Sequence, residues 1–233
     1  MKKLILASTS TLYGEAYLNY LLPILNKHFK AGETLLFIPF ARPGGLSHEE
    51  YTARAQRVFN ELDIEVKGLH EFKDQTAALE EAQGIFTGGG NTFLLVSELY
   101  KRKLMAPLRT VIFKGTPYLG TSAGSNICGL SMQTTNDMPI IYPPSFKTLG
   151  AVPFNINPHY IDPRAGDDHM GETRETRIKE YHKYNTPPVV GLREGSWLEV
   201  NDDEIKLKGE HDARIFLQDK KAYEVSTGSA ILL

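Results

Sequence analysis

The segment that decides the fold is Tyr118-Leu119-Gly120-Thr121-Ser122-Ala123-Gly124. Its first part is short and apolar, which is typical of a buried strand, and a helix is expected to begin after Ser122. A serine between two glycines on such a turn projects its hydroxyl from the sheet edge, at the positive end of the next helix. The sequence therefore predicts a nucleophile elbow at Ser122, with the backbone N–H of Ala123 as one donor to an oxyanion.

Short apolar runs alternate with helical patterns on the N-terminal side of this segment. Strands are expected at residues 4–7, 35–38, 64–69 and 85–87. Helices are expected at residues 18–25, 51–62, 77–82 and 93–99. Ser47 and Glu50 have the spacing of a capping box before the second of these helices. Apolar strands that alternate with helices indicate an α/β fold, with a mostly parallel sheet flanked by helices on both faces.

The second half of the chain is less regular. Residues 137–164 are rich in proline and aromatic side chains and are expected to form ordered loops that wall the site. A helix is expected at 172–181 and a further core strand at 189–192. After Trp197, short alternating segments predict antiparallel strands at one edge. No repeat or linker interrupts the chain, so residues 1–233 are interpreted as a single domain.

Composition and charge exclude several classes of function. Hydrophobic residues make up 41% of the 233 residues and charged residues 23%, which are values of a folded globular protein. The formal charge of -2 gives no basic excess that would attract nucleic acid. The apolar start at residues 4–7 is too short for a signal peptide, and no run approaches the ~18 residues of a membrane span. We therefore expect a cytoplasmic protein that binds neither nucleic acid nor membrane.

The sequence also disfavours metal and nucleotide sites. Cys128 is the single cysteine, so no disulfide can form within the chain, and its place after the elbow predicts a buried side chain. Residues 115–122 have the glycine spacing of a phosphate loop, but Thr121 stands where that loop needs lysine. Residues 88–92 lack the third glycine of a dinucleotide-binding loop. No metal-ligand spacing is present, so no metal or other cofactor is expected.

A serine nucleophile needs a base, and His159 is the preferred candidate. It ends an apolar, strand-like run that Pro158 stops, which places it at the end of a sheet element. The other histidines downstream of the serine lie in polar or charged segments: His169, His182 and His211. The acid that orients the base is predicted to be Glu194, directly after the strand at 189–192, with Asp137 and Asp162 as rivals.

A second glycine-rich turn is expected next to the elbow. Gly88-Gly89-Gly90-Asn91 follows a predicted strand, and parallel sheets bind ligands beyond the carboxyl ends of their strands. The backbone N–H of Gly90, or that of Gly89, is therefore predicted to complete the oxyanion hole with Ala123.

Seven segments match a known family, in the same order along the chain. They are 37–40 (FIPF), 88–93 (GGGNTF), 120–126 (GTSAGSN), 134–139 (TTNDMP), 157–160 (NPHY), 171–174 (GETR) and 194–197 (EGSW). Through them the chain resembles the peptidase E family of α-aspartyl dipeptidases, a serine peptidase group that also contains the cyanophycinases. The resemblance implies a fold similar to class I glutamine amidotransferases and a Ser-His-Glu triad, carried by Ser122, His159 and Glu194.

The same resemblance implies hydrolysis of dipeptides with an N-terminal aspartate and poor action on longer peptides. Arg174 stands where the family carries the arginine that binds the aspartyl side chain, with Arg177 as the fallback. Asn91 and Asp137, in two of the shared segments, are also predicted to contact this small peptide substrate.

Two other functions stay open at this point. An esterase could use the same elbow, although Asp137 would then have to supply the acid that lies between serine and histidine in α/β-hydrolase order. A non-catalytic binding domain of amidotransferase-like fold is the second alternative. The sequence leaves the oligomeric state undecided, a homodimer included.

Overall fold

The computed structural model describes residues 1–163 and 171–233, and seven of the strands in this part form the central sheet. Their order across the sheet is β3-β2-β4-β5-β1-β8-β9. The strands are β1 (Lys3–Ala7), β2 (Thr34–Ile38), β3 (Glu65–Gly68), β4 (Gly84–Thr87), β5 (Tyr118–Thr121), β8 (Ser196–Asn201) and β9 (Glu204–Gly209). Strands β1 to β5 run parallel, whereas β8 and β9 add an antiparallel edge beside β1. The first four strands, and antiparallel pairing after Trp197, are as the sequence predicts.

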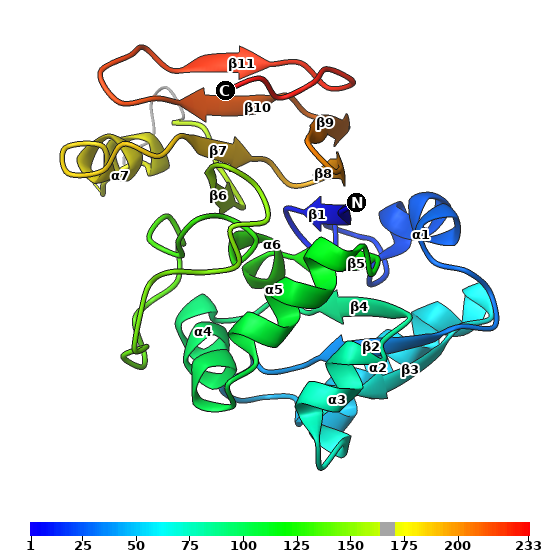
Figure 1. Ribbon diagram of the computed structural model, residues 1–233. Coiled ribbons are helices and arrows are strands. Elements are labelled where there is room, and N and C mark those ends of the chain that lie inside the picture. The colour runs from blue at the N-terminus through cyan, green and yellow to red at the C-terminus, as the bar shows by residue number, and fades with distance from the viewer. Residues whose placement is uncertain (164–170) are drawn as a thin grey trace.

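Helices cover both faces of this sheet (Figure 1). Alternate strand residues face opposite layers, so Leu4 and Leu6 pack in one apolar cluster while Ile5 and Ala7 pack in another. One face carries α1 (Leu22–His28) and α2 (His48–Phe59). The other face carries α3 (Gln75–Glu80), α4 (Thr92–Lys101), α5 (Met105–Lys114) and α6 (Ala123–Asn126). Three single-turn helices lie between these elements: η1 (Asn19–Leu21), η2 (Asn60–Leu62) and η3 (Leu69–Glu71).

A second sheet of four strands packs against the α6 side of the first, within the described residues. Its order is β11-β10-β7-β6, with strands β6 (Asn155–Pro158), β7 (Val189–Leu192), β10 (Ala213–Phe216) and β11 (Tyr223–Val225). Strands β6 and β7 are parallel, and the others pair antiparallel. Helix α7 (Arg174–Tyr181) packs on this sheet through Ile178, which joins Val189 and Phe216 in one apolar cluster.

Some sequence expectations differ from the structure. The capping box is confirmed, since Glu50 Oε2 accepts from Ser47 N–H at 2.8 Å and Ser47 Oγ accepts from Glu50 N–H at 3.1 Å. Helix α1 starts later than predicted because Leu18 has φ 58°, a left-handed conformation that a helix cannot contain. Residues 137–164 are mostly loops, as expected, and the predicted strand-like run before His159 is β6. The strand predicted at 189–192 exists, but it lies in the second sheet.

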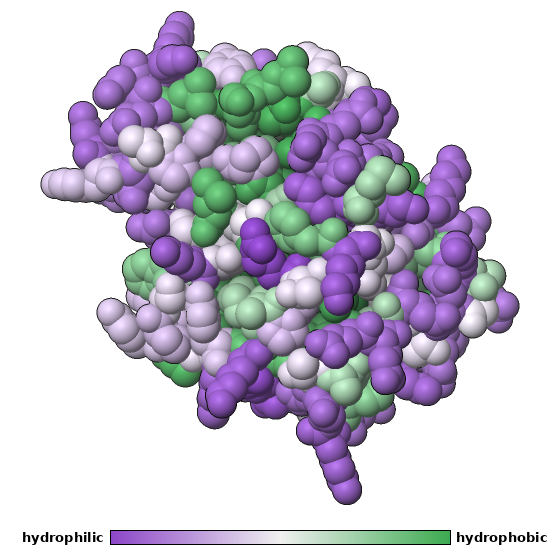
Figure 2. All heavy atoms as spheres, viewed as in Figure 1, coloured by the Kyte–Doolittle hydropathy of each residue, from purple (hydrophilic) through white to green (hydrophobic). Residues whose placement is uncertain are grey.

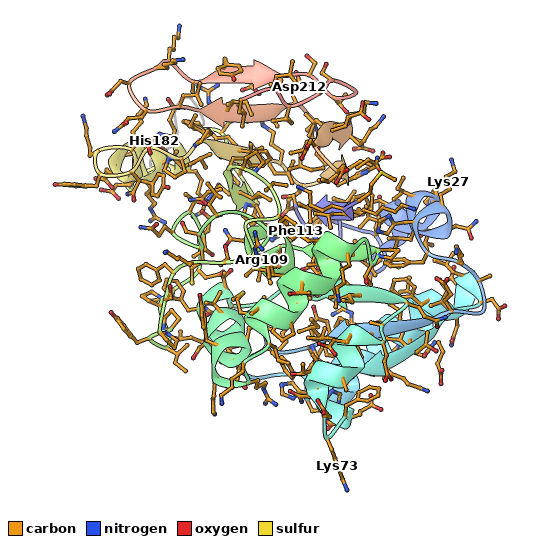
Figure 3. All side chains as sticks on the ribbon, in the orientation of Figure 1. Lys27, Lys73, Arg109, Phe113, His182 and Asp212 are labelled. Atoms are coloured by element: carbon orange, nitrogen blue, oxygen red, sulfur yellow. The ribbon has the colours of Figure 1, made fainter. Side chains whose placement is uncertain are left out.

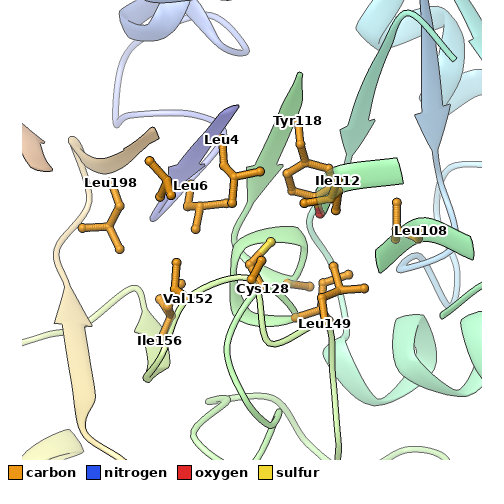
Figure 4. Close-up of a cluster of buried hydrophobic side chains, with 14 of the residues drawn as sticks. Leu4, Leu6, Leu108, Ile112, Tyr118, Cys128, Leu149, Val152, Ile156 and Leu198 are labelled. Atoms are coloured by element: carbon orange, nitrogen blue, oxygen red, sulfur yellow. The ribbon is translucent and has the colours of Figure 1, made fainter. Parts of the chain in front are cut away.

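The main apolar cluster joins the two sheets (Figure 4). Leu6 of β1, Leu198 of β8 and Ile156 of β6 are completely buried in it. Cys128 lies in the same cluster, as predicted, and burial raises the pKa of its thiol to about 12. The thiol is therefore an inert core group at neutral pH.

The loop between α6 and β6 is held against α5. Arg109 Nε donates to the Leu149 carbonyl at 2.9 Å, and its guanidinium lies 4.2 Å from the centre of the Phe113 ring (Figure 3). On the face seen in Figure 2, hydrophilic residues cover most of the surface and hydrophobic residues interrupt it in separate areas. Across the described ranges, no helix has the length and apolar character needed to cross a membrane.

Candidate active site

Ser122 lies on a sharp turn between β5 and α6. Its backbone has φ 53° and ψ −111°, a conformation that residues other than glycine rarely adopt and that costs about 1–3 kcal/mol. The Ser122 N–H donates to the Ala7 carbonyl at 3.1 Å, and Ser125 Oγ donates to the same oxygen at 2.6 Å. The end of β1 therefore holds the elbow in its strained form.

The flanking glycines of the elbow are required by close backbone approach. A Cβ on Gly124 would overlap the carbonyl oxygen of Thr87 at the end of β4. A Cβ on Gly120 would overlap the carbonyl oxygen of Gly124 itself. The G-x-S-x-G pattern is thus explained by packing of the turn against β4, with Ser122 left at the edge of the sheet.

His159 and Glu194 follow β6 and β7, the two parallel neighbours of the second sheet. His159 Nε2 lies 2.8 Å from Ser122 Oγ, and His159 Nδ1 lies 2.5 Å from Glu194 Oε1. The three side chains thus form a continuous chain of hydrogen bonds. The His159 side chain is 35% exposed and that of Glu194 is 51% exposed, so these hydrogen-bonded side chains are open to solvent and to a ligand.

The donor and acceptor roles in this chain follow from the carboxylate. An ionised Glu194 only accepts hydrogen bonds, so the proton of a neutral imidazole lies on Nδ1. Nε2 then carries the lone pair and accepts from the Ser122 hydroxyl. This tautomer suits an imidazole that takes a proton from a serine.

Ser8 connects the two sheets directly beside this chain. Its completely buried hydroxyl donates to the Leu192 carbonyl at 2.7 Å and accepts from the His159 N–H at 2.8 Å. His159 has φ 53°, so its backbone is also held in a rarely occupied conformation. Ser8 follows β1 in the central sheet, whereas Leu192 and His159 belong to or follow strands of the second sheet.

The glycine-rich turn after β4 borders the elbow, as expected. A Cβ on Gly89 would lie 3.0 Å from Ser122 Cβ, and Gly90 packs against the Ala41 carbonyl with φ 146°. The Tyr51 hydroxyl donates to the Gly89 carbonyl at 3.1 Å. Because a peptide unit is planar and trans, this bond directs the Gly90 N–H to the opposite side.

The amide hydrogens near Ser122 are available to a ligand. Within residues 1–163 and 171–233, neither the Gly90 N–H nor the Ala123 N–H donates to a protein group. Two unpaired N–H groups beside a serine hydroxyl can bind a negatively charged oxygen.

Asn91 and Asp137 both accept hydrogen bonds from backbone N–H groups at the N-terminus of α4. The Asn91 side chain accepts from Leu94 N–H at 3.1 Å and donates to the Met138 carbonyl at 2.8 Å. Asp137 Oδ2 accepts from the N–H and hydroxyl of Thr92, at 2.7 and 2.6 Å. It also accepts from Thr135 Oγ1 at 3.0 Å, so these bonds use one of the two carboxylate oxygens.

Arg174 is the first residue of α7 and lies close to Asp137. Burial lowers the pKa of Arg174, the positive charge of Arg177 lowers it further, and the negative charge of Asp137 opposes both. Arg174 forms no ion pair within the described part of the chain, whereas Arg177 lies 3.9 Å from Glu172. Arg174 is therefore a half-buried cation without a protein counter-ion among these residues.

The rival site residues contact other groups. His182 Nε2 lies 3.0 Å from the Pro187 carbonyl, and the His211 N–H donates to Ser196 Oγ at 3.0 Å. Asp162 accepts two hydrogen bonds from Arg193, at 2.8 Å each, and these bonds lower the pKa of Asp162. His169 lies outside the described residues.

No cluster of three His, Cys, Asp or Glu side chains in the described ranges is arranged to hold a metal ion.

Ser8 and Tyr51 have roles at the site that the sequence did not indicate. Ser8 was visible as the residue that ends the first apolar run, at the same sheet edge as Ser122. Tyr51 lay on the apolar face of the helix that follows the capping box, where an aromatic residue indicates core packing. A tyrosine hydroxyl needs a partner when it is buried, and this was the one available sign of a polar role.

The chain is similar to proteins of one peptidase family. The model of peptidase family S51 matches residues 4–208. Peptidase E of Streptomyces coelicolor is 47% identical over 226 residues, which are 97% of this chain and 92% of that protein. A protein of Drosophila melanogaster, named as a probable alpha-aspartyl dipeptidase, is 44% identical over 228 residues, 97% of this chain and 94% of its own length.

The fold has counterparts among solved structures. The crystal structure of a peptidase from an acI-B1 actinobacterium matches with a TM-score of 0.69 and 17% identity, covering 100% of this chain and 97% of that one. This likeness confirms the predicted α/β fold. The chain belongs to peptidase family S51, which confirms the peptidase E resemblance and the serine peptidase class predicted from its sequence.

Proposed function

We propose that this peptidase hydrolyses dipeptides with an N-terminal aspartate, with Ser122 as nucleophile, His159 as general base and Glu194 as the acid that orients the base. The observation that carries the proposal is the continuous chain of contacts from Ser122 Oγ through His159 to Glu194, at 2.8 and 2.5 Å. The Drosophila relative named as an alpha-aspartyl dipeptidase supports the substrate class.

The reaction proceeds through an acyl-enzyme. His159 Nε2 takes the hydroxyl proton as Ser122 Oγ attacks the peptide carbonyl, and Glu194 stabilises the imidazolium that forms. The imidazolium then gives its proton to the leaving amine as the C–N bond breaks. A water molecule, deprotonated by His159, attacks the ester, and the returning proton regenerates Ser122.

The negative oxygen of each tetrahedral intermediate is bound by backbone N–H groups. Gly90 and Ala123 are the preferred donors because, within the described residues, their N–H groups beside Ser122 are unpaired. Gly89 supplies the carbonyl that Tyr51 holds, and it thereby orients the Gly90 N–H. Preorganised donors of this kind are each typically worth ~100–1000-fold in rate.

The aspartyl residue is recognised through its two charges. Arg174 binds the side-chain carboxylate, because its planar guanidinium offers two parallel N–H donors. No counter-ion among the described residues occupies these donors. The Oδ1 atom of Asp137, which accepts none of the bonds described above, is proposed to bind the substrate ammonium group. Asn91 caps α4 directly before Thr92, which donates to Asp137, and it is proposed to contact the substrate from there.

A substrate panel tests the proposed function. Purified enzyme is assayed with Asp-Leu, Glu-Leu, Ala-Leu and Asp-Leu-Ala, and with short acyl esters. Turnover is expected for Asp-Leu well above the other peptides and the esters. Esters cleaved faster than Asp-Leu would favour the esterase alternative. A chain that cleaves none of them and resists labelling by a fluorophosphonate would be a binding domain.

Arg174→Ala is expected to lower kcat/KM for Asp-Leu by about 100-fold, the scale of a lost charge-assisted contact. The slow turnover of Ala-Leu should fall much less, because that substrate has no carboxylate side chain. The matched control is Arg177→Ala, one helical turn away, which should change kcat/KM for neither Asp-Leu nor Ala-Leu. Equal losses on both substrates would indicate a structural role for Arg174, and a selective defect in Arg177→Ala would transfer the role to that residue.

Ser8→Ala is expected to lower kcat by about tenfold with little change in KM. The substitution leaves the His159 N–H without an acceptor in a buried seam, so the imidazole loses its fixed direction toward Ser122. Stopped assays over a range of Asp-Leu concentrations measure both constants. Ile205→Val, a mild core change in β9, should reduce the melting temperature without changing kcat. An unchanged kcat in Ser8→Ala would show that the hydroxyl does not position His159.

We propose that the substrate is a small peptide and that the enzyme acts in the cytoplasm. Cell fractionation tests the location, and light scattering of the purified protein decides between a monomer and a homodimer.

A further inference from the structure

Arg42 is a second arginine without a counter-ion near the candidate site. It follows β2, its side chain is half-buried, and its Nε atom is buried with no hydrogen-bond partner among the described residues. No carboxylate in the described ranges lies within ion-pair distance of it. By contrast, Arg102, the C-cap residue of α4, is paired with Glu98 at 2.9 Å. A partly buried guanidinium without a partner is costly unless a ligand supplies the anion.

The position of Arg42 is tied to the glycine-rich turn beside Ser122. Its neighbour Ala41 packs against Gly90 and accepts from the Asn91 N–H at 2.7 Å. The guanidinium lies 4.9 Å from the centre of the Tyr51 ring, and the hydroxyl of that ring holds the Gly89 carbonyl. Arg42 therefore lies over the residue that directs the proposed oxyanion donor.

Arg42 and Arg174 reach the surroundings of this turn from different elements. Arg42 lies in the segment between β2 and α2, near Tyr17. Burial raises the pKa of Tyr17, and the positive charges of Arg54 and Arg42 oppose that rise. Arg174 begins α7 and lies close to Asp137, whose carboxylate accepts from Thr92 at the start of α4. Two cations without a counter-ion in the described ranges thus border the turn beside Ser122, Arg42 through Ala41 and Tyr51 and Arg174 through Asp137.

A dipeptide offers one more anion than the aspartyl side chain. Its second residue ends in an α-carboxylate, whose carbon lies only about 3–4 Å from the scissile carbonyl carbon along the covalent chain. In a longer peptide or an amide, this position holds a neutral carbonyl. A cation here would therefore favour dipeptides over all longer substrates.

We propose that Arg42 binds the α-carboxylate of the second substrate residue, and that this contact selects dipeptides. The proposal rests on the dipeptidase function proposed above. Arg42 also lines an open hollow of about 500 Å³. Its apolar lining includes Phe40, Leu94, Ile140 and Ile141, and its charged lining comprises Arg42, Glu98, Lys101 and Arg102. An apolar side chain on the second residue fits this lining, while the guanidinium fork takes the carboxylate.

The test compares Asp-Leu with Asp-leucinamide, which differ only in the C-terminal charge. Values of kcat/KM are measured for wild type, Arg42→Met, Arg42→Lys and Arg54→Met. The wild type is expected to prefer the free acid by at least about 30-fold, a typical scale for a charge-assisted contact. Arg42→Met should lose that preference by slowing Asp-Leu alone. Arg42→Lys should retain part of it, since it keeps the charge and loses the fork.

Arg54→Met is the matched control, because Arg54 stacks on Tyr17 at 4.4 Å, one aromatic ring further from the turn. It should keep the wild-type preference. Equal losses on acid and amide in Arg42→Met, or a wild type that does not distinguish them, would overturn the proposal.

A failure of the dipeptidase function itself would be recognised separately, as absence of Asp-Leu turnover in the wild type. Binding then provides the readout: calorimetry of Asp-Leu and Asp-leucinamide is repeated with Ser122→Ala, with and without Arg42→Met. An acid preference in binding that disappears with Arg42→Met supports the carboxylate site, and any other result overturns it.

Discussion

Ser122→Ala is expected to lower kcat for Asp-Leu by about 1000-fold or more, the usual scale for a nucleophile in a triad. The hydroxyl is the group that His159 Nε2 contacts, so no other atom of the variant can form the acyl-enzyme. The fold should survive, because removing one hydroxyl at the sheet edge opens no cavity in the core. Steady-state kinetics and labelling by a fluorophosphonate measure the loss.

Thermal unfolding provides the control for this variant. The backbone bond from residue 122 to the Ala7 carbonyl does not involve the side chain, so the melting temperature should stay close to that of the wild type. Wild-type turnover by a preparation of Ser122→Ala free of other peptidases would contradict a serine mechanism.

His159→Ala is expected to reduce kcat to a similar level. Serine and base act as a unit, so the double variant with Ser122→Ala should be no slower than either single one. Full activity in His159→Ala would transfer the role of base to another histidine, with His169 next to be substituted. Burst kinetics with an activated ester would show whether acylation, deacylation or both are slowed.

Glu194→Gln is expected to cost less than the loss of the base. The amide removes the negative charge but can still accept a bond from His159 Nδ1 through its oxygen. If kcat does not change, the third position passes to Asp137, although that carboxylate already accepts from Thr92 and Thr135.

Local patterns in the sequence predict the elements of this fold well. The capping box of Ser47 and Glu50, the apolar runs of β1, β2 and β4, and the elbow at Ser122 depend on neighbours a few residues apart. Helix α5 was not predicted, because residues 105–114 carry no cap at the N-terminus and Pro107 interrupts the pattern.

Contacts between distant segments explain what the sequence did not indicate. The bond between Ser8 and His159 joins residues 151 positions apart, and no local pattern encodes it. The division into two sheets has the same origin, since the apolar composition of β7 would equally suit a strand of the central sheet. The position of Arg42 over Tyr51 likewise depends on how the chain turns after β2.

The place of β1 bears on how the peptidase is made on the ribosome. This N-terminal strand lies between β5 and β8, so its partners Leu119 and Glu199 are translated long after it. The nucleophile emerges well before Glu194, and at about 5–20 residues per second the interval is on the order of ten seconds. A nascent chain that ends before Glu194 therefore lacks the third residue of the proposed triad.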